Sequence, residues 1–177
     1  SVIDTAAGTV VKELSLPNGS GLLKDLRVSP DGKYAVVSHI LARYPLPTTQ
    51  LDRGWMSTNA KTIIDLERLE IINTVLLDSV DSGAANPRGM AWSADGATLV
   101  VTHAGTHELS VINFPALLDK LARIPATLEA GRGDPYAASR VQADVPNDLS
   151  FLVGLRRRLK LPETDRGSHV RALRPGT

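Results

Sequence analysis

Cysteine is absent from the 177 residues of this sequence. The chain itself therefore cannot form a disulfide, a thiolate metal site or the covalent attachment site of a c-type haem. No apolar run approaches the length that spans a membrane. The net charge is only +1, which argues against general nucleic-acid binding. We therefore expect no membrane span and no nucleic-acid partner.

Several motifs that mark enzymes and ion sites are missing as well. The sequence has no Asp-x-Asp-x-Asp calcium loop, no Gly-x-Ser-x-Gly nucleophile turn, and no P-loop or dinucleotide fingerprint. We predict no catalytic residue, and whether the protein is an enzyme stays open. With 42% hydrophobic and 22% charged residues, the chain has enough apolar material to form a globular core.

Residues 87–113 show the pattern around which the chain is organised. Three short strands are predicted at Met90–Trp92, Thr98–Thr102 and Glu108–Ile112. The first two are joined by Ser93–Gly96, in which Asp-Gly supplies the residues that tolerate a positive φ. The pattern is therefore that of a short antiparallel meander.

The same pattern occurs earlier in the chain. Ser29–Gly32 carries the matching Asp-Gly turn and leads into the predicted strand Tyr34–His39. The spacing between the two turns equals the spacing between His39 and His103. A strand pattern that recurs at a fixed spacing is the signature of a repeat fold.

Further matches extend the repeat in both directions. One strand type occurs at Ser1–Asp4, Thr62–Asp65 and Ser110–Asn113, and the strand type that follows it at 10–16, 70–77 and 151–161. The ending Val170–Gly176 aligns with the first strand and turn of a new unit. One unit therefore has four antiparallel strands in about 45 residues, the size of a β-propeller blade.

We predict an all-β fold for residues 1–177: a β-propeller fragment of about two blades plus the start of a third. Insertions are predicted at 41–59 and 114–149, the second with one short helix over Pro115–Arg123 and an irregular loop over 130–146. The chain begins at Ser1 without an initiator Met or signal peptide, and its last unit is incomplete. We therefore expect the remaining blades to come from chain outside this sequence.

The strands Val36–His39 and Val100–His103 resemble the repeats of the YVTN-type bacterial β-propellers. An Asp-Gly turn upstream and Ser1–Asp4-like strands downstream belong to the same pattern. Both copies here place His where Asn is usual. The insertions look similar to those of extracytoplasmic propellers beside c-type cytochrome or haem-peroxidase modules. The resemblance implies a bacterial protein at the periplasm or cell surface, with haem in the intact protein or its partner.

The two repeated histidines are the candidate metal ligands. His39 and His103 occupy equivalent positions on neighbouring blades, so two imidazoles facing one space would suit a metal or a haem iron. In the alternative interpretation each His closes its strand end, as the usual Asn would, with a ring nitrogen holding a loop.

The first insertion supplies the candidate partner-binding residues. Arg43, Arg53 and Trp55 are side chains typical of binding hot spots, and ordered insertions in compact folds are often functional. The alternative is that Trp55 packs over its own blade and Arg53 pairs with a carboxylate. The run Arg156–Lys160 alternates like a solvated outer strand, whose charged edge would deter pairing rather than bind an anionic partner.

Three functions remain open from the sequence. The first is a binding scaffold that docks or shields a haem-bearing redox partner in electron transfer. The second is a propeller enzyme, either a haem- or metal-dependent oxidoreductase or a lactonase-like hydrolase, with its site at the propeller mouth. The third is a structural surface-layer or adhesion repeat. Fold alone does not decide among them.

Overall fold

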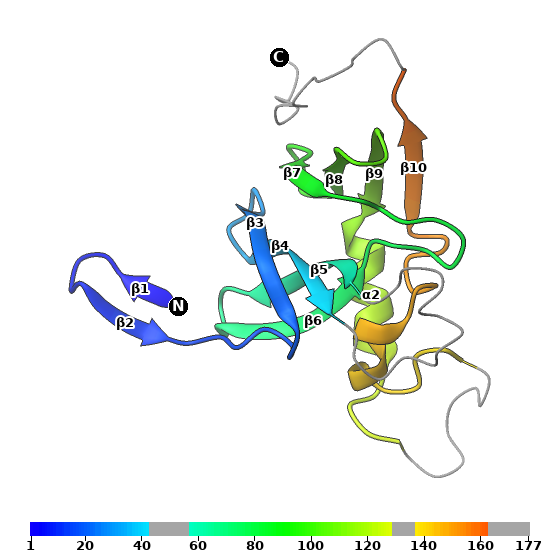
Figure 1. Ribbon diagram of the computed structural model, residues 1–177. Coiled ribbons are helices and arrows are strands. Elements are labelled where there is room, and N and C mark those ends of the chain that lie inside the picture. Colours follow the sequence, from blue (N-terminus) through cyan, green and yellow to red (C-terminus); the bar gives the residue numbers. More distant parts are fainter. Residues whose placement is uncertain (43–56, 129–136, 163–177) are drawn as a thin grey trace.

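The computed structural model describes residues 1–42, 57–128 and 137–162, and two four-stranded antiparallel sheets dominate it (Figure 1). We call the first sheet blade 1. Its strands follow one another in chain order as a meander: β3 (Ser20–Val28), β4 (Tyr34–Ala42), β5 (Ser57–Asp65) and β6 (Glu70–Leu76).

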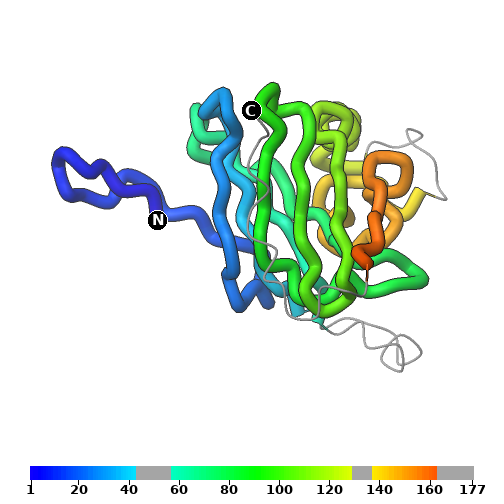
Figure 2. Tube along the Cα trace, turned by 90° about the horizontal axis from the view of Figure 1, so that it is seen from above, coloured from blue at the N-terminus to red at the C-terminus, as the bar shows by residue number. Residues whose placement is uncertain are grey.

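Blade 2 has the same meander topology. Its strands are β7 (Pro87–Trp92), β8 (Thr98–His103), β9 (Glu108–Asn113) and β10 (Arg156–Lys160). The innermost strands β3 and β7 contact each other and lie side by side (Figure 2). The prediction of an all-β fold built from four-stranded antiparallel propeller blades is thus confirmed.

A separate hairpin precedes blade 1. It consists of β1 (Val2–Asp4) and β2 (Thr9–Lys12) and projects away from both sheets (Figures 1 and 2). Asp4 accepts the backbone N–H groups of Ala6 and Ala7, and Asp65 in blade 1 accepts those of Glu67 and Arg68 in the same way. The hairpin therefore repeats the turn between the third and fourth strands of a blade.

The two Asp-Gly turns are built alike. In blade 1 the Ser29 hydroxyl donates to Asp31 at 2.5 Å and accepts the N–H of Tyr34 at 2.9 Å. Ser93, in blade 2, makes the equivalent pair of bonds at 2.5 and 2.8 Å. The serine hydroxyl holds the pKa of each turn aspartate below its usual value. Glycine ends each turn because φ is +72° and +71° there.

Paired strands extend further than the sequence indicated beside the first insertion. Leu41 pairs with Thr58, and Ala42 pairs with Ser57. The predicted insertion 41–59 is therefore too wide, because both of its ends belong to the blade 1 ladder.

The second insertion leaves blade 2 directly after β9. Helix α2 (Phe114–Arg123) is capped by Asn113, whose side chain accepts the N–H of Ala116. A 3₁₀ helix, η1 (Gln142–Asn147), then packs against β6. The predicted helix is confirmed with its start one residue earlier, whereas the irregular loop predicted for 130–146 is wrong from Gln142 onward.

The main core joins both blades and the insertion. Alternation along the strands turns Val36, Ile63 and Val75 of blade 1 toward Met90 and Val101 of blade 2. Phe114 closes this core from α2, with its ring edge-to-face against Trp92 at 4.6 Å and against Tyr34 at 5.5 Å between ring centroids. Among the described residues no helix has the length and apolarity needed to cross a membrane.

Candidate functional site

The predicted partner-binding residues Arg43, Arg53 and Trp55 lie outside the described residues. Their role stays a prediction. The other predicted residues, His39 and His103, are placed by the structure, together with several polar groups that the sequence did not single out.

His103 ends β8 and is 1% exposed. Its Nδ1 lies 3.0 Å from the carbonyl of Ala84, and its Nε2 lies 2.8 Å from the hydroxyl of Ser110 on β9. A carbonyl can only accept, so Nδ1 carries the proton and Nε2 accepts from the serine. Burial lowers the pKa of His103 to about 4, which keeps the ring neutral in this arrangement.

His39 repeats the arrangement on β4 and is fully buried. Its Nδ1 faces the carbonyl of Ile40 at 3.2 Å, and its Nε2 accepts from Thr62 at 2.8 Å. Thr62 in turn shares a 2.7 Å bond with Thr74 on β6. Burial lowers the pKa of His39 as well. The hydroxyl partner comes from the same repeat position in both blades, Thr62 in one and Ser110 in the other.

Both rings therefore use both nitrogens in hydrogen bonds within the protein. His103 lies at the end of β8 and holds the segment before its blade, whereas His39 lies inside β4 and contacts the carbonyl of the next residue of that strand. Neither ring therefore holds the loop after its strand, which the capping interpretation expects. In the described ranges 1–42, 57–128 and 137–162, no three metal-ligating side chains gather together. The metal interpretation of His39 and His103 stays a prediction: loss of Zn²⁺ binding when both become Asn would support it, and unchanged binding would end it.

Lys61 is a buried lysine at the contact between the blades. It lies on β5, in register with Ser38 on β4 and Val75 on β6, and is 1% exposed. Its Nζ has no hydrogen-bond partner in the part of the chain that the structure describes. Burial lowers the pKa of Lys61 to about 7, and the charge of Asp25 opposes this shift.

Asp25 ties the inner strands of the two blades together. Its Oδ2 accepts the backbone N–H of Met90 on β7 at 3.0 Å and the Nε of Arg27 at 3.3 Å. A carboxylate on the first strand of one blade thus satisfies an amide on the first strand of the next. This bond fixes the two strands relative to each other where they lie side by side.

Two arginines on β10 hold the segment that connects the blades, residues 77–86, which we call the blade linker. Arg156 donates to the carbonyl of Leu77. Arg158 donates to Ser82 and Gly83 and pairs with Glu108. The predicted alternation along β10 is confirmed. The prediction of a solvated face is wrong for Arg156 and Arg158, because both side chains turn inward onto the linker.

The linker is also held from β8 and the turn that follows it. The N–H of Ala104 donates to Asn86, and the N–H of Gly105 donates to Ala85. A Cβ at position 105 would lie 2.8 Å from the Cβ of Ala85, so only glycine permits this approach. Together with His103, these bonds engage the carbonyls of three successive linker residues, Ala84, Ala85 and Asn86.

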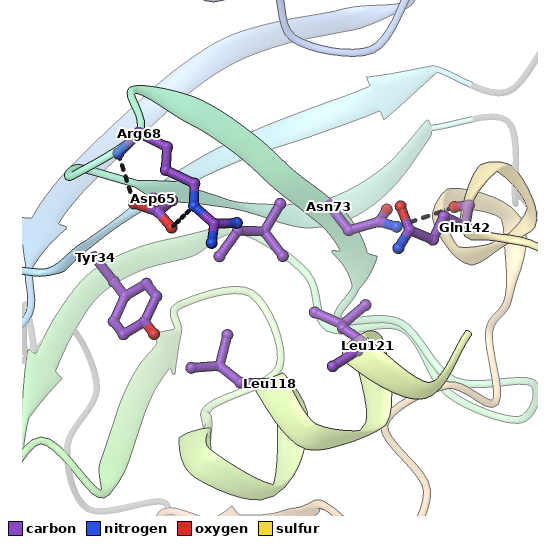
Figure 3. A pocket seen from close by; sticks show the side chains of 9 residues that line it. Tyr34, Asp65, Arg68, Asn73, Leu118, Leu121 and Gln142 are labelled. Carbon is purple, nitrogen blue, oxygen red and sulfur yellow. Dashed lines mark hydrogen bonds and ion pairs between the residues drawn. The ribbon is translucent and has the colours of Figure 1, made fainter. Parts of the chain in front are cut away.

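A pocket opens where the second insertion packs against the outer edge of blade 1 (Figure 3). Its volume is about 230 Å³. The apolar lining comes from Ile72 on β6 and from Leu118 and Leu121 on α2. We call this hollow the rim pocket.

Polar side chains border the rim pocket at two ends (Figure 3). At one end Asp65 accepts the N–H of Arg68 at 2.9 Å, and the Arg68 Nε lies 4.0 Å from the same carboxylate. At the other end the Asn73 amide donates to the backbone carbonyl of Gln142 at 3.0 Å. Tyr34 points toward the apolar lining from the blade side.

Sequence reasoning missed Lys61, Asp25 and the rim pocket for different reasons. Lys61 did carry a signal, because a lysine in a strand flanked by apolar and β-branched residues is an anomaly. Asp25 looks like any polar residue of an edge strand. The rim pocket joins β6 to an insertion that follows in another blade, and no local pattern reports such a contact.

Comparison with known proteins found similarity to hydrazine synthase in sequence and in fold. No protein-family model matches the sequence. The hydrazine synthase subunit beta of Kuenenia stuttgartiensis is 31% identical over 116 residues, which cover 66% of this chain and 30% of that protein. The chain thus spans about a third of the length of this curated relative.

The fold has a counterpart among solved structures. Kuenenia stuttgartiensis hydrazine synthase matches with a TM-score of 0.70 and 24% sequence identity, covering 89% of this chain and 41% of that chain. At this identity the match shows the fold alone. It supports the propeller-type arrangement of the two blades.

Proposed function

We propose that this chain is part of a β-propeller subunit of a hydrazine-synthase-type complex and acts there as a binding scaffold for a haem-bearing redox partner. The observation that carries the proposal is the 31% identity to a protein named as the beta subunit of hydrazine synthase. A subunit by its name assembles with others. The match covers only a third of that protein, so the role of the whole protein is part of the proposal.

The internal chemistry of the blades favours a scaffold over a catalyst. His103, Asp25 and Arg158 all hold backbone groups of the blade contact or the blade linker. They therefore serve the fixed placement of one blade against the next. A rigid platform of this kind suits the presentation of loops and insertions to a partner.

Apolar surface at the N-terminal side fits packing against further blades. The strand β3 and the hairpin expose a set of large hydrophobic side chains: Ile3, Val10, Val11, Leu22, Leu23, Leu26 and Val28. Contiguous exposed apolar residues mark interaction surfaces. We propose a further blade of the YVTN type as the element that covers them, in a protein of the bacterial periplasm or cell surface.

The test is mild purification of the tagged protein from its source, followed by size-exclusion chromatography with absorption monitoring. The proposal expects haem Soret absorption to elute with the protein in fixed proportion. Replacement of Arg43, Arg53 and Trp55 by Ala should weaken this co-elution, whereas Arg157→Ala, on the exposed face of β10, should not. Elution as a haem-free species of the mass of the protein alone would refute the scaffold role.

The enzyme alternative makes a different prediction for the same preparation. If the chain belongs to a propeller enzyme, the preparation should keep its catalytic activity after the haem-bearing partner is removed. If the chain is a scaffold, the preparation should lose that activity and regain it when the partner is added back.

A further inference from the structure

The rim pocket is the part of the structure that neither the blade repeat nor the proposed scaffold role accounts for. A blade needs four strands and a linker, and the pocket is instead made by α2 and η1 folding back onto β6. Asn113 caps α2 directly at the end of β9, and Leu121 is buried against the core. The wall that carries Leu118 and Leu121 is thereby fixed in place.

Three polar groups at the pocket have hydrogen-bonding capacity left over among the described residues. Arg68 engages Asp65 through Nε alone, and its side chain is 77% exposed, so both terminal nitrogens are available. The Tyr34 hydroxyl has no partner in the described chain. The Gln142 side chain donates to Ile124 through Nε2 and keeps its oxygen. An apolar hollow with a few convergent polar groups is the usual form of a small-ligand site.

The size of the rim pocket limits the ligand. At about 30 Å³ per water molecule, 230 Å³ holds about eight waters, or a ligand of about ten non-hydrogen atoms. The apolar lining suits a ring or a branched chain of that size. The one cation at the border suits a carboxylate, which guanidinium binds through two parallel hydrogen bonds.

We propose that the rim pocket binds a small carboxylate with an apolar body, the carboxylate on Arg68 and the body against Leu118 and Leu121. The Tyr34 hydroxyl and the Gln142 side-chain oxygen meet any polar group that the body carries. This site is independent of partner docking and stands whether or not the scaffold role is correct.

The test uses three probes with the same phenyl body and different charge: phenylacetate, phenylacetamide and 2-phenylethylamine. Ligand-observed NMR titration of the purified protein should give the tightest binding for phenylacetate, with a Kd of about 1 mM, as expected for ten atoms. Arg68→Gln should weaken phenylacetate about tenfold and leave phenylacetamide unchanged. Arg157→Gln removes an exposed arginine elsewhere and should change neither.

A second variant tests the position of the site. Ala122 lines the pocket on the exposed side of α2, so Ala122→Leu fills the hollow without touching the buried face. This variant should abolish binding of phenylacetate and phenylacetamide. The proposal is overturned if Ala122→Leu binds normally, if no probe reaches saturation, or if 2-phenylethylamine binds at least as tightly as phenylacetate, which would mean that Asp65 dominates the site.

Discussion

Replacing Lys61 by Met should make the protein more stable at neutral pH. The Lys61 amine is desolvated at the contact between the blades and has no hydrogen-bond partner among the described residues. Met keeps an unbranched stem of similar length and has no charge to desolvate. The packing of the stem is therefore preserved while the cost of burying the amine is removed.

The lowered pKa of Lys61 gives the size of the expected gain in the free energy of unfolding. A fall from 10.5 to about 7 corresponds to roughly 4–5 kcal/mol, at about 1.4 kcal/mol per pKa unit. This shift already includes the attraction to Asp25, so Lys61→Met should raise the free energy of unfolding at pH 7 by up to about 4 kcal/mol. Between pH 7 and 10.5 the unfolded chain holds a proton that the folded chain has released. The stability of the natural protein therefore rises with pH in this window.

The assay is urea denaturation of both proteins at pH 7 and pH 10. The advantage of the Met variant should shrink to about 1 kcal/mol or less at pH 10, because the unfolded lysine then approaches its own pKa. Lys160→Met, at an exposed position of β10, should change stability by less than about 0.5 kcal/mol at either pH. A Met variant that is less stable at pH 7, or whose advantage is the same at both pH values, would show that Lys61 is charged and paired.

Three further predictions concern the bonds that hold the blades. Because the pKa of His103 is lowered to about 4, the stability that its neutral ring contributes is present above pH 6.5 and is lost as the pH falls toward 4. Over that range the free energy of unfolding, measured by urea denaturation, should fall by roughly 3 kcal/mol more for the natural protein than for His103→Asn. An equal pH dependence of the two proteins would contradict this. Arg158→Gln should lower the free energy of unfolding by about 1–3 kcal/mol and speed amide hydrogen exchange in the blade linker. Arg157→Gln should change neither quantity. Unchanged exchange in the linker would show that Arg158 does not hold this segment. Asp25→Ala leaves the N–H of Met90 without its acceptor and should cost about 1–3 kcal/mol by the same assay, so an unaffected midpoint would exclude this bond as a tie between the blades.

The blade pattern was predictable because it is local. Within each blade the Asp-Gly turn lies within a few residues of the β-branched strand that follows it, and the second blade repeats this pattern at a fixed spacing. The helix after Asn113 was predictable for the same reason, since its cap and apolar spacing are adjacent in sequence. Repetition then turned short and individually weak signals into a single architecture.

The functional assignments divide differently. The repeated histidines were visible in the sequence, but whether His39 and His103 face a ligand or protein groups depends on where Thr62 and Ala84 lie in space. Alternation on β10 was visible too, whereas the blade linker that Arg156 and Arg158 cover comes from a distant part of the chain.

The sequence by itself determined the Asp-Gly turns, the helix after Asn113, the four-stranded blade and its repetition, since these follow from residue conformational preferences and from periodicity within short segments. Only the tertiary structure decided the burial of Lys61, the partners of Asp25 and Arg158 and the existence of the rim pocket. Each of these depends on which segments meet when two blades and an insertion pack together. Burial and the local dielectric, which set the pKa of Lys61, are properties of that packing and not of any stretch of sequence.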